Sequence, residues 1–311
     1  MASRTLTVVG AARSFRRSHT RDVPQSIPPL PVFGVSEFTT WPWSYDHDLE
    51  RYAALGVGAI EVCEFKLDPE RAEAQLARVQ ELGLIVSSVQ PRLHSLFPDA
   101  PRPLPAEPAQ RMALYRETIR RFGRAAPGTT LVSISGAAPD GNYRLAFETA
   151  VREYRALAEF AGEHGVRIAL EPLNPILMNE DTFLCSLPDA MEVVAAVDLP
   201  SFGVFVDVWH IWADEGAPRQ IREAGSKIFG VHLNDWHRPR HFGDRVSIGD
   251  GQIDLPVLVR AIHESGYQGA YTLEIFSSDH LPDSLWKGDL DALIAKNQAA
   301  FAAVWAQAFA A

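Results

Sequence analysis

The stretch GVFVDVWH (203–210) is typical of a buried parallel strand whose carboxyl end carries functional side chains. Its first four residues are apolar or glycine without polar alternation, which is the pattern of a strand covered on both faces. Asp207 and His210 then follow at the end of the run. Three further runs end in the same way: RIALEP (167–172), IFGVHLND (228–235) and AYTLEI (270–275).

Short apolar runs alternate with long amphipathic segments over most of the chain, which is the signature of βα units and a parallel sheet. The expected strands cover residues 32–37, 59–63, 85–89, 130–135, 167–171, 203–207, 228–233 and 270–275. The expected helices cover residues 46–55, 69–82, 106–125, 143–165, 188–197, 218–224, 255–265 and 285–309. Glycines that follow several of these segments, such as Gly56 and Gly83, are typical helix stops.

Eight strands and eight helices match the number of units in a (β/α)8 TIM barrel, so we predict an α/β fold with a single such domain over residues 32–311. A doubly wound open sheet is the alternative, but it normally has a glycine-rich phosphate loop after its first strand. Here residues 36–42 read SEFTTWP, which is not glycine-rich. Residues 1–31 are expected to form a flexible N-terminal extension, because termini are usually poorly ordered.

The composition is that of an ordinary globular protein with enough apolar material for a core. Of 311 residues, 47% are hydrophobic and 22% are charged, and the formal net charge is −10. This acidic balance argues against nucleic acid as a partner. The sequence has no apolar run of about 18 residues that would span a membrane, and its two cysteines cannot build a disulfide framework. We therefore expect a cytoplasmic protein without a membrane partner.

Motifs of several other enzyme classes are missing from the sequence. There is no G-x-S-x-G elbow and no phosphate loop of the Walker type. None of the four lysines is well positioned to form a Schiff base at the barrel mouth, as an aldolase of that class requires. Arg238, Arg240 and Arg245 could meet a phosphate, but solvent exposure is the plainer interpretation of these arginines.

Four expected strands end in side chains that ligate metals: Glu171, Asp207, His232 and Glu274. Active sites of such barrels lie at the carboxyl ends of the strands, so these groups are expected to converge there. Alone, each carboxylate could equally be a helix cap or an ion-pair partner. Together, three carboxylates would repel one another without a cation. They predict one divalent ion, with Mn²⁺ as first choice and Mg²⁺, Co²⁺ or Zn²⁺ as alternatives.

The order of these motifs resembles the xylose-isomerase-like superfamily of sugar isomerases and epimerases, which also contains endonuclease IV. The resemblance covers residues 32–308 and rests on LEP (170–172), DVWH (207–210), HLND (232–235), GDGQID (249–254), GYQG (266–269) and LE (273–274). It implies the same four metal ligands. It also implies that His210 contacts the substrate, and that Arg238 binds a substrate oxygen as in the ketose 3-epimerase branch.

The endonuclease branch uses three zinc ions, and their extra ligands are missing here. An Asp-x-His pair is needed after strand seven, but residues 244–246 read DRV. His94, after strand three, is the one candidate left for an additional ligand. A DNA-repair site is therefore disfavoured.

The residues and the resemblance together predict a divalent-metal-dependent isomerase or epimerase of a ketose, sugar or cyclitol. The ion would stabilise an enediolate while Glu171 and Glu274 move the proton. The alternative is a carbon–oxygen lyase, either a dehydratase like inosose dehydratase or an enzyme that cleaves 3-oxo-glycosides, with His210 as proton donor to the leaving group. Relatives of this kind are commonly oligomers, so a homo-oligomer is an option for which the sequence has no interface signal.

Aromatic and polar side chains follow several of the expected strands and are candidate walls of the substrate site. Trp41 follows strand one, His94 follows strand three and Trp209 follows strand six. Aromatic faces stack on apolar C–H surfaces, so these residues suggest a platform for a sugar or an aryl glycoside. Asn174, in the long segment after strand five, is expected to reach the same substrate.

Overall fold

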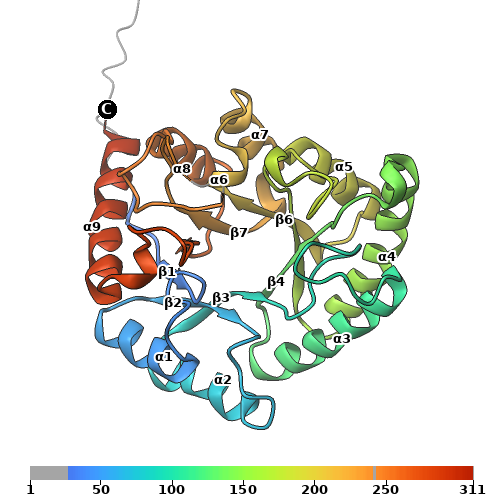
Figure 1. The fold of residues 1–311 in the computed structure, drawn as a ribbon, viewed down its shortest axis with the longest axis horizontal. Coiled ribbons are helices and arrows are strands. Elements are labelled where there is room, and N and C mark those ends of the chain that lie inside the picture. The colour runs from blue at the N-terminus through green and yellow to red at the C-terminus, as the bar shows by residue number, and fades with distance from the viewer. Residues whose placement is uncertain (1–26, 241–242, 311) are drawn as a thin grey trace, which may run out of the picture.

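The computed structural model describes residues 27–240 and 243–310, and its eight parallel strands close into a barrel (Figure 1). Each strand pairs with the next in the sequence, and β8 pairs with β1, so the barrel has no free edge. The strands are β1 (Phe33–Ser36), β2 (Ala59–Cys63), β3 (Ile85–Gln90), β4 (Thr130–Ile134), β5 (Arg167–Glu171), β6 (Phe202–Asp207), β7 (Ile228–Leu233) and β8 (Tyr271–Leu273). The predicted single-domain (β/α)8 barrel is confirmed.

Helices surround the barrel as an outer ring (Figure 1). They are α1 (Tyr45–Ala54), α2 (Ala72–Glu81), α3 (Pro108–Ala125), α4 (Tyr143–Glu163), α5 (Leu187–Val197), α6 (Val208–Ile211), α7 (Ala217–Ala224), α8 (Leu255–Glu264) and α9 (Leu290–Phe309). The one-turn α6 was not predicted, and it forms because Asp207 Oδ1 accepts a hydrogen bond from the Trp209 N–H at 2.8 Å. The last helix begins five residues later than expected, where Asp289 caps it through the Ala292 N–H.

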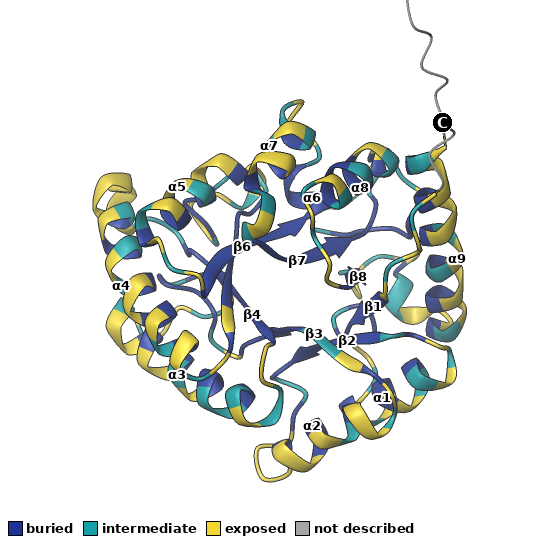
Figure 2. Cartoon of the chain, turned by 180° about the vertical axis from the view of Figure 1, so that it is seen from behind, coloured by how far each residue is buried: buried dark blue, intermediate teal, exposed yellow. Residues whose placement is uncertain are grey.

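The barrel is filled by a small apolar layer, while a larger core lies between the sheet and the helices. Val132, Ala169, Phe205 and Phe229 form the inner layer. Gly230 is required beside it, because a Cβ at that position would lie 2.1 Å from the Phe205 ring. The strands are buried throughout most of their length and the helices expose only their outer faces (Figure 2).

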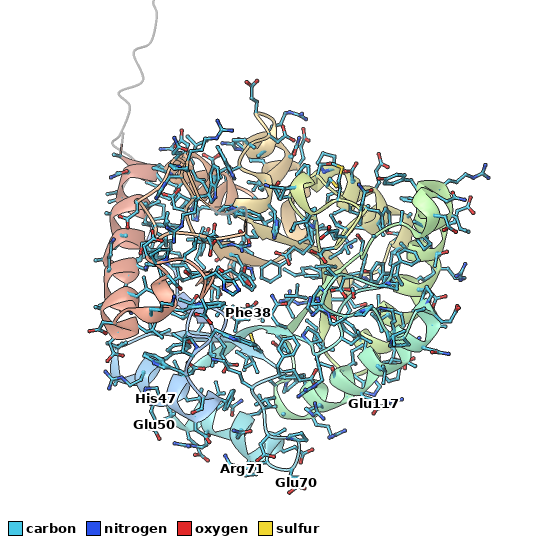
Figure 3. The ribbon with its side chains drawn as sticks, viewed as in Figure 1. Phe38, His47, Glu50, Glu70, Arg71 and Glu117 are labelled. Carbon is cyan, nitrogen blue, oxygen red and sulfur yellow. The ribbon has the colours of Figure 1, made fainter. Side chains whose placement is uncertain are left out.

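The functional side chains lie above this inner layer because alternate residues of a strand face the barrel interior. Side chains two residues apart share a face of a strand, so Glu171 follows Ala169 and Asp207 follows Phe205 on the inner face. The carboxylates therefore point into the barrel mouth. Phe38, just beyond β1, lies near the centre of the mouth, whereas Glu50 on α1 lies at the periphery (Figure 3).

The expected N-terminal extension falls mostly on residues 1–26, which lie outside the described residues. Close to the start of the described chain, the Pro28 carbonyl accepts a hydrogen bond from Trp305 Nε1 of α9 at 2.9 Å. Among the described helices, none combines the length and apolar character that crossing a membrane requires.

Candidate active site

The four predicted metal ligands meet at the carboxyl end of the barrel. His232 Nδ1 lies 3.4 Å from Glu274 Oε2 and 3.8 Å from Glu171 Oε1. Ligand atoms of Glu171, Asp207 and His232 all lie within 4.8 Å of one another. All four side chains are buried. The expected convergence of four strand ends is therefore present in the fold.

Glu61 on β2, which was not predicted from the sequence, holds the imidazole of His232. His232 Nε2 lies 2.8 Å from Glu61 Oε2, and Ser88 Oγ donates to the same oxygen at 2.6 Å. Since a carboxylate accepts hydrogen bonds, Nε2 carries the hydrogen and Nδ1 is turned toward Glu171 and Glu274. Within the described residues, this buried Nδ1 has no hydrogen-bond partner. A carboxylate that fixes a ligating histidine in this way is a common feature of metal sites.

Without a bound cation, several side chains of this centre hold extra protons. Burial raises the pKa of Glu171 well above its usual value and that of Glu274 to about 8. Burial opposes protonation of His232, but Glu274 and Glu61 outweigh it and raise its pKa to about 10. In the ion-free protein a protonated His232 thus supplies the positive charge that a divalent ion would bring. Three carboxylates and the His232 Nδ1, which has no hydrogen-bond partner among the described residues, fit such an ion.

Asp207 is held in its ionised form by several donors. Its Oδ1 accepts from Asn234 Nδ2 at 3.0 Å as well as from the Trp209 N–H, and its Oδ2 accepts from Arg245 Nη2 at 3.1 Å. Burial works against this charge, but the pKa of Asp207 is lowered to about 2, chiefly by the positive charge of Arg245.

Arg245 is the arginine that lines the cavity near the ligands, a position predicted for Arg238. Its Nη2 also lies 3.6 Å from Glu274 Oε2, and its guanidinium stacks over the rings of Trp209 at 4.5 Å and Phe276 at 4.7 Å. Arg245 is buried, so the solvent-exposed interpretation of this residue was wrong. Arg238 is the exposed one, and its side chain does not line the cavity.

His210 faces the ligands with one ring nitrogen and the loop after β5 with the other. Its Nδ1 accepts a hydrogen bond from the Asn174 backbone N–H at 2.8 Å. Its Nε2 lies 3.6 Å from Asp207 Oδ2 and 3.9 Å from Glu171 Oε1. Burial lowers the pKa of His210 to about 3, so the ring is neutral and carries its hydrogen on Nε2. Asn174 therefore orients His210 through its backbone, and its side chain does not line the cavity.

His94 lines the same cavity and, unlike His210, offers a hydrogen-bond acceptor to it. Its Nδ1 lies 2.8 Å from the Pro91 carbonyl oxygen and 3.1 Å from Arg102 Nη1. The shorter contact is with an acceptor, so Nδ1 carries the hydrogen and Nε2 has a free lone pair. Burial and then Arg102 lower the pKa of His94 well below its usual value, which keeps the ring neutral. His94 is thus an acceptor, whereas His210 is a donor.

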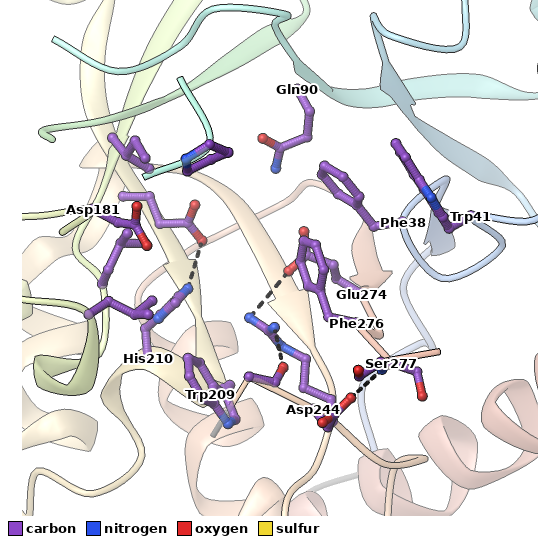
Figure 4. Close-up of a pocket in the computed structure, with 18 of the residues that line it drawn as sticks. Phe38, Trp41, Gln90, Asp181, Trp209, His210, Asp244, Glu274, Phe276 and Ser277 are labelled. Atoms are coloured by element: carbon purple, nitrogen blue, oxygen red, sulfur yellow. Dashed lines mark hydrogen bonds and ion pairs between the residues drawn. The ribbon is translucent and has the colours of Figure 1, made fainter. Parts of the chain in front are cut away.

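A cavity of about 650 Å³ opens above these groups, and most of its exposed surface is apolar. Phe38 and Trp41 lie across it from His210 and Asp181 (Figure 4). Of the predicted residues, the lining includes Glu171, Glu274, His210, His94, Trp41 and Trp209. It also includes Gln90, Phe38, Phe65 and Trp286, which the sequence analysis did not single out. They come from the ends of different strands and from the loops that follow, and no local sequence signal indicates that they meet.

Comparisons with known proteins agree with this architecture. Inosose isomerase of Halalkalibacterium halodurans is 33% identical over 129 residues, which are 40% of this chain and 44% of that enzyme. The 3-dehydroshikimate dehydratase of Pseudomonas putida is 32% identical over 138 residues, which are 41% of this chain and 20% of that enzyme. The chain thus matches less than half the length of either enzyme.

Two longer matches cover most of the chain. The L-ribulose-5-phosphate 3-epimerase UlaE of Shigella flexneri is 25% identical over 236 residues, 72% of this chain and 79% of that enzyme. The IolI protein, solved with a zinc atom bound, is 20% identical with a TM-score of 0.74 over 90% of this chain and 99% of that one. The family model described as Xylose isomerase-like TIM barrel matches residues 49–296. The chain belongs to the xylose isomerase-like TIM-barrel family.

Proposed function

We propose that this protein is a divalent-metal-dependent isomerase or epimerase of an α-hydroxyketone, either a ketose or a cyclitol ketone. The observation that carries the proposal is the buried Nδ1 of His232, which has no hydrogen-bond partner among the described residues, is directed at two carboxylates and is fixed in place by Glu61. Its relatives include an inosose isomerase and a sugar-phosphate 3-epimerase, which supports chemistry on a small polyhydroxylated ketone.

Glu171, Asp207, His232 and Glu274 would hold the ion, with Mn²⁺ as first choice. A bound divalent ion supplies Lewis-acid polarisation of the carbonyl oxygen, which makes the neighbouring C–H more acidic. Arg245 stays beside Asp207 and Glu274 and fixes the orientation of both carboxylates. Its two aromatic neighbours keep water away from the guanidinium, which strengthens these contacts.

Glu171 and Glu274 are the proton-transfer groups of the proposed reaction. Both line the cavity, and their strands are separated by two others in the barrel. One carboxylate takes the proton from the carbon next to the carbonyl, and the other returns a proton. Return to the same carbon on the opposite face gives an epimer, and return to the neighbouring carbon gives an isomer. The two carboxylates are thus general base and general acid.

His210 and His94 orient the substrate through complementary hydrogen bonds. His210 Nε2–H donates to a substrate oxygen, and the His94 Nε2 lone pair accepts from a hydroxyl group. Both rings are neutral and buried, so neither loses its role through ordinary changes of pH. A polyol can form both hydrogen bonds, because one of its oxygens can accept from His210 while the hydroxyl group of another donates to His94.

A carbon–oxygen lyase is the second candidate, and the match to a dehydratase favours it. Removal of the same proton leaves electron density on the carbon next to the carbonyl. If a hydroxyl group occupies the following carbon, its C–O bond breaks, a C=C bond forms, and the hydroxide takes a proton and leaves as water. His210 Nε2–H would hydrogen-bond that leaving oxygen.

Proton exchange in deuterium oxide tests both candidates. Manganese-loaded protein is incubated in D₂O with a panel of free ketohexoses, ketopentose phosphates, inososes and aryl 3-oxo-glucosides, and NMR follows the carbon-bound proton next to the carbonyl. We expect deuterium to replace it in at least one compound, with an epimer or isomer as product. Chelator-treated protein is the control and should exchange nothing. Appearance of the absorbance of an enone, with no isomer formed, would support the lyase instead. Absence of deuterium exchange in every compound would overturn the proposal.

A further inference from the structure

We infer that the substrate of this site carries a planar apolar group attached to its sugar or cyclitol head, and that it carries no phosphate. The inference rests on the proposed function, because it takes the head group to be bound at the ligand cluster. An aryl glycoside or aryl ether of a polyol is the class of molecule that fits. Two features of the cavity support this class: its aromatic side and the pairing of its cations with carboxylates.

Aromatic rings run without interruption from the ligand cluster to the rim. Arg245, which contacts Glu274, lies 4.7 Å from the Phe276 ring, and that ring lies 4.5 Å from Phe38. Phe38 then stacks on Trp41 with 5.7 Å between ring centroids and an interplanar angle of 20°. A ligand whose head group is bound at the carboxylates therefore has an apolar surface beside it from the metal ligands to the rim of the cavity.

The outer end of this surface is built from Trp41, Trp286 and Phe65. Trp41 stacks against Trp286 at 6.4 Å and contacts the edge of Phe65 at 6.4 Å. The Trp286 indole is fixed because its Nε1 donates to the Phe38 carbonyl at 3.0 Å. Trp41 nevertheless remains 42% exposed. A large aromatic side chain left exposed inside a cavity is what a flat apolar ligand group covers.

The two sides of the cavity differ in a way that suits an amphipathic ligand. His210 and Asp181 lie on one side, and Phe38 and Trp41 lie on the other (Figure 4). A volume of about 650 Å³ lies in the range of pockets that hold drug-sized ligands. A free hexose would occupy the polar end and leave the aromatic side in contact with water. An attached ring would fill that space.

The cations that line the cavity are already paired with carboxylates. Among the described lining residues they are Arg102 and Arg245. Arg102 Nε donates to Asp99 Oδ2 at 2.9 Å and Nη2 bonds the same carboxylate. Arg245 is held by Asp207. A phosphate would therefore have to compete with a carboxylate that each of these cations already contacts.

Calorimetry with matched glycosides tests the inference. Phenyl β-D-glucopyranoside, methyl β-D-glucopyranoside and glucose 6-phosphate are titrated into manganese-loaded protein. We expect the phenyl glycoside to bind about tenfold or more tightly than the methyl glycoside, which lacks only the ring. We also expect Trp41→Ala to remove that difference. Trp43→Ala is the control, because Trp43 lies in the same loop but packs on His47 and does not line the cavity.

Three results would overturn the inference. They are equal or undetectable binding of the phenyl and methyl glycosides, tightest binding of the phosphate, and an equal effect of the two tryptophan variants. The same titrations on chelator-treated protein separate the inference from the proposed function. Suppose that the phenyl glycoside still binds more tightly than the methyl glycoside, but that the protein neither requires metal nor exchanges substrate protons. The proposed function is then wrong, whereas the inferred binding surface for an aromatic ring is supported.

Discussion

Glu61 and His232 come from β2 and β7, 171 residues apart in the chain, and form a buried contact of 2.8 Å between Oε2 and Nε2. The contact turns Nδ1 of His232 toward Glu171 and Glu274. It therefore decides which nitrogen of the imidazole is available to a metal ion.

Replacement of this carboxylate should weaken the metal site without removing a ligand. We expect Glu61→Gln to lower divalent-metal affinity by about 10- to 100-fold, because the histidine loses the charge that fixes its orientation. Competitive titration against a metal-sensitive dye measures the change. Glu64→Gln is a matched control, since Glu64 is also buried but pairs with Arg121 outside the cavity. Equal affinity of Glu61→Gln and wild type would contradict the role of Glu61.

Glu274 is the sharpest test of the proposed chemistry. Glu274→Gln keeps an oxygen ligand but removes the group that accepts a proton, and loss of a general base costs about 10²–10⁴ in rate. We expect deuterium exchange to fall by that factor while the circular dichroism spectrum stays unchanged. Glu64→Gln, which alters a buried carboxylate outside the cavity, serves as control. Activity within a few-fold of wild type would remove Glu274 from the reaction.

His210 should act as a neutral hydrogen-bond donor and not as a ligand. We expect His210→Ala to leave metal content intact and to lower kcat/KM by about 10²-fold. Because burial lowers its pKa to about 3, His210 is already deprotonated well below neutrality and should add no inflection between about pH 5 and pH 8. Metal analysis and a pH–rate profile on one preparation check this. Loss of metal together with activity would make His210 a ligand instead.

Metal binding should be coupled to proton release. In the ion-free protein His232, with a pKa of about 10, and Glu274, with a pKa of about 8, are both protonated near neutral pH. An ion must displace these protons, so its apparent affinity should fall as the pH is lowered. Calorimetry in two buffers of different ionisation enthalpy should show more than one proton released per ion.

The same preparation tests the stoichiometry. We expect one ion per chain, and saturation to about 100 times Kd should stabilise the fold by about 2.7 kcal/mol, visible as a higher Tm. Three zinc ions per chain, or binding without proton release, would be inconsistent with a single site built on His232.

The sequence by itself was enough to determine the barrel and four converging side chains. Strands buried on both faces read as apolar runs, and their alternation with helical segments is a local pattern. Glu171 and Asp207 end two of these runs, and the carboxyl ends of parallel strands share one rim of a barrel. Convergence of those residues therefore follows from topology alone, without knowledge of any distance.

Only the tertiary structure decided which other residues complete the site. Glu61 lies inside a strand, and nothing local shows that a partner from β7 meets it across the barrel. Arg245, and not Arg238, reaches the cavity because the loop folds back on Asp235, whose carboxylate accepts from the Gly251 and Ile253 N–H groups. The path of a long loop is set by such distant hydrogen bonds. The residue that it delivers to the site is therefore a property of the folded chain, whereas strand ends are fixed by local periodicity.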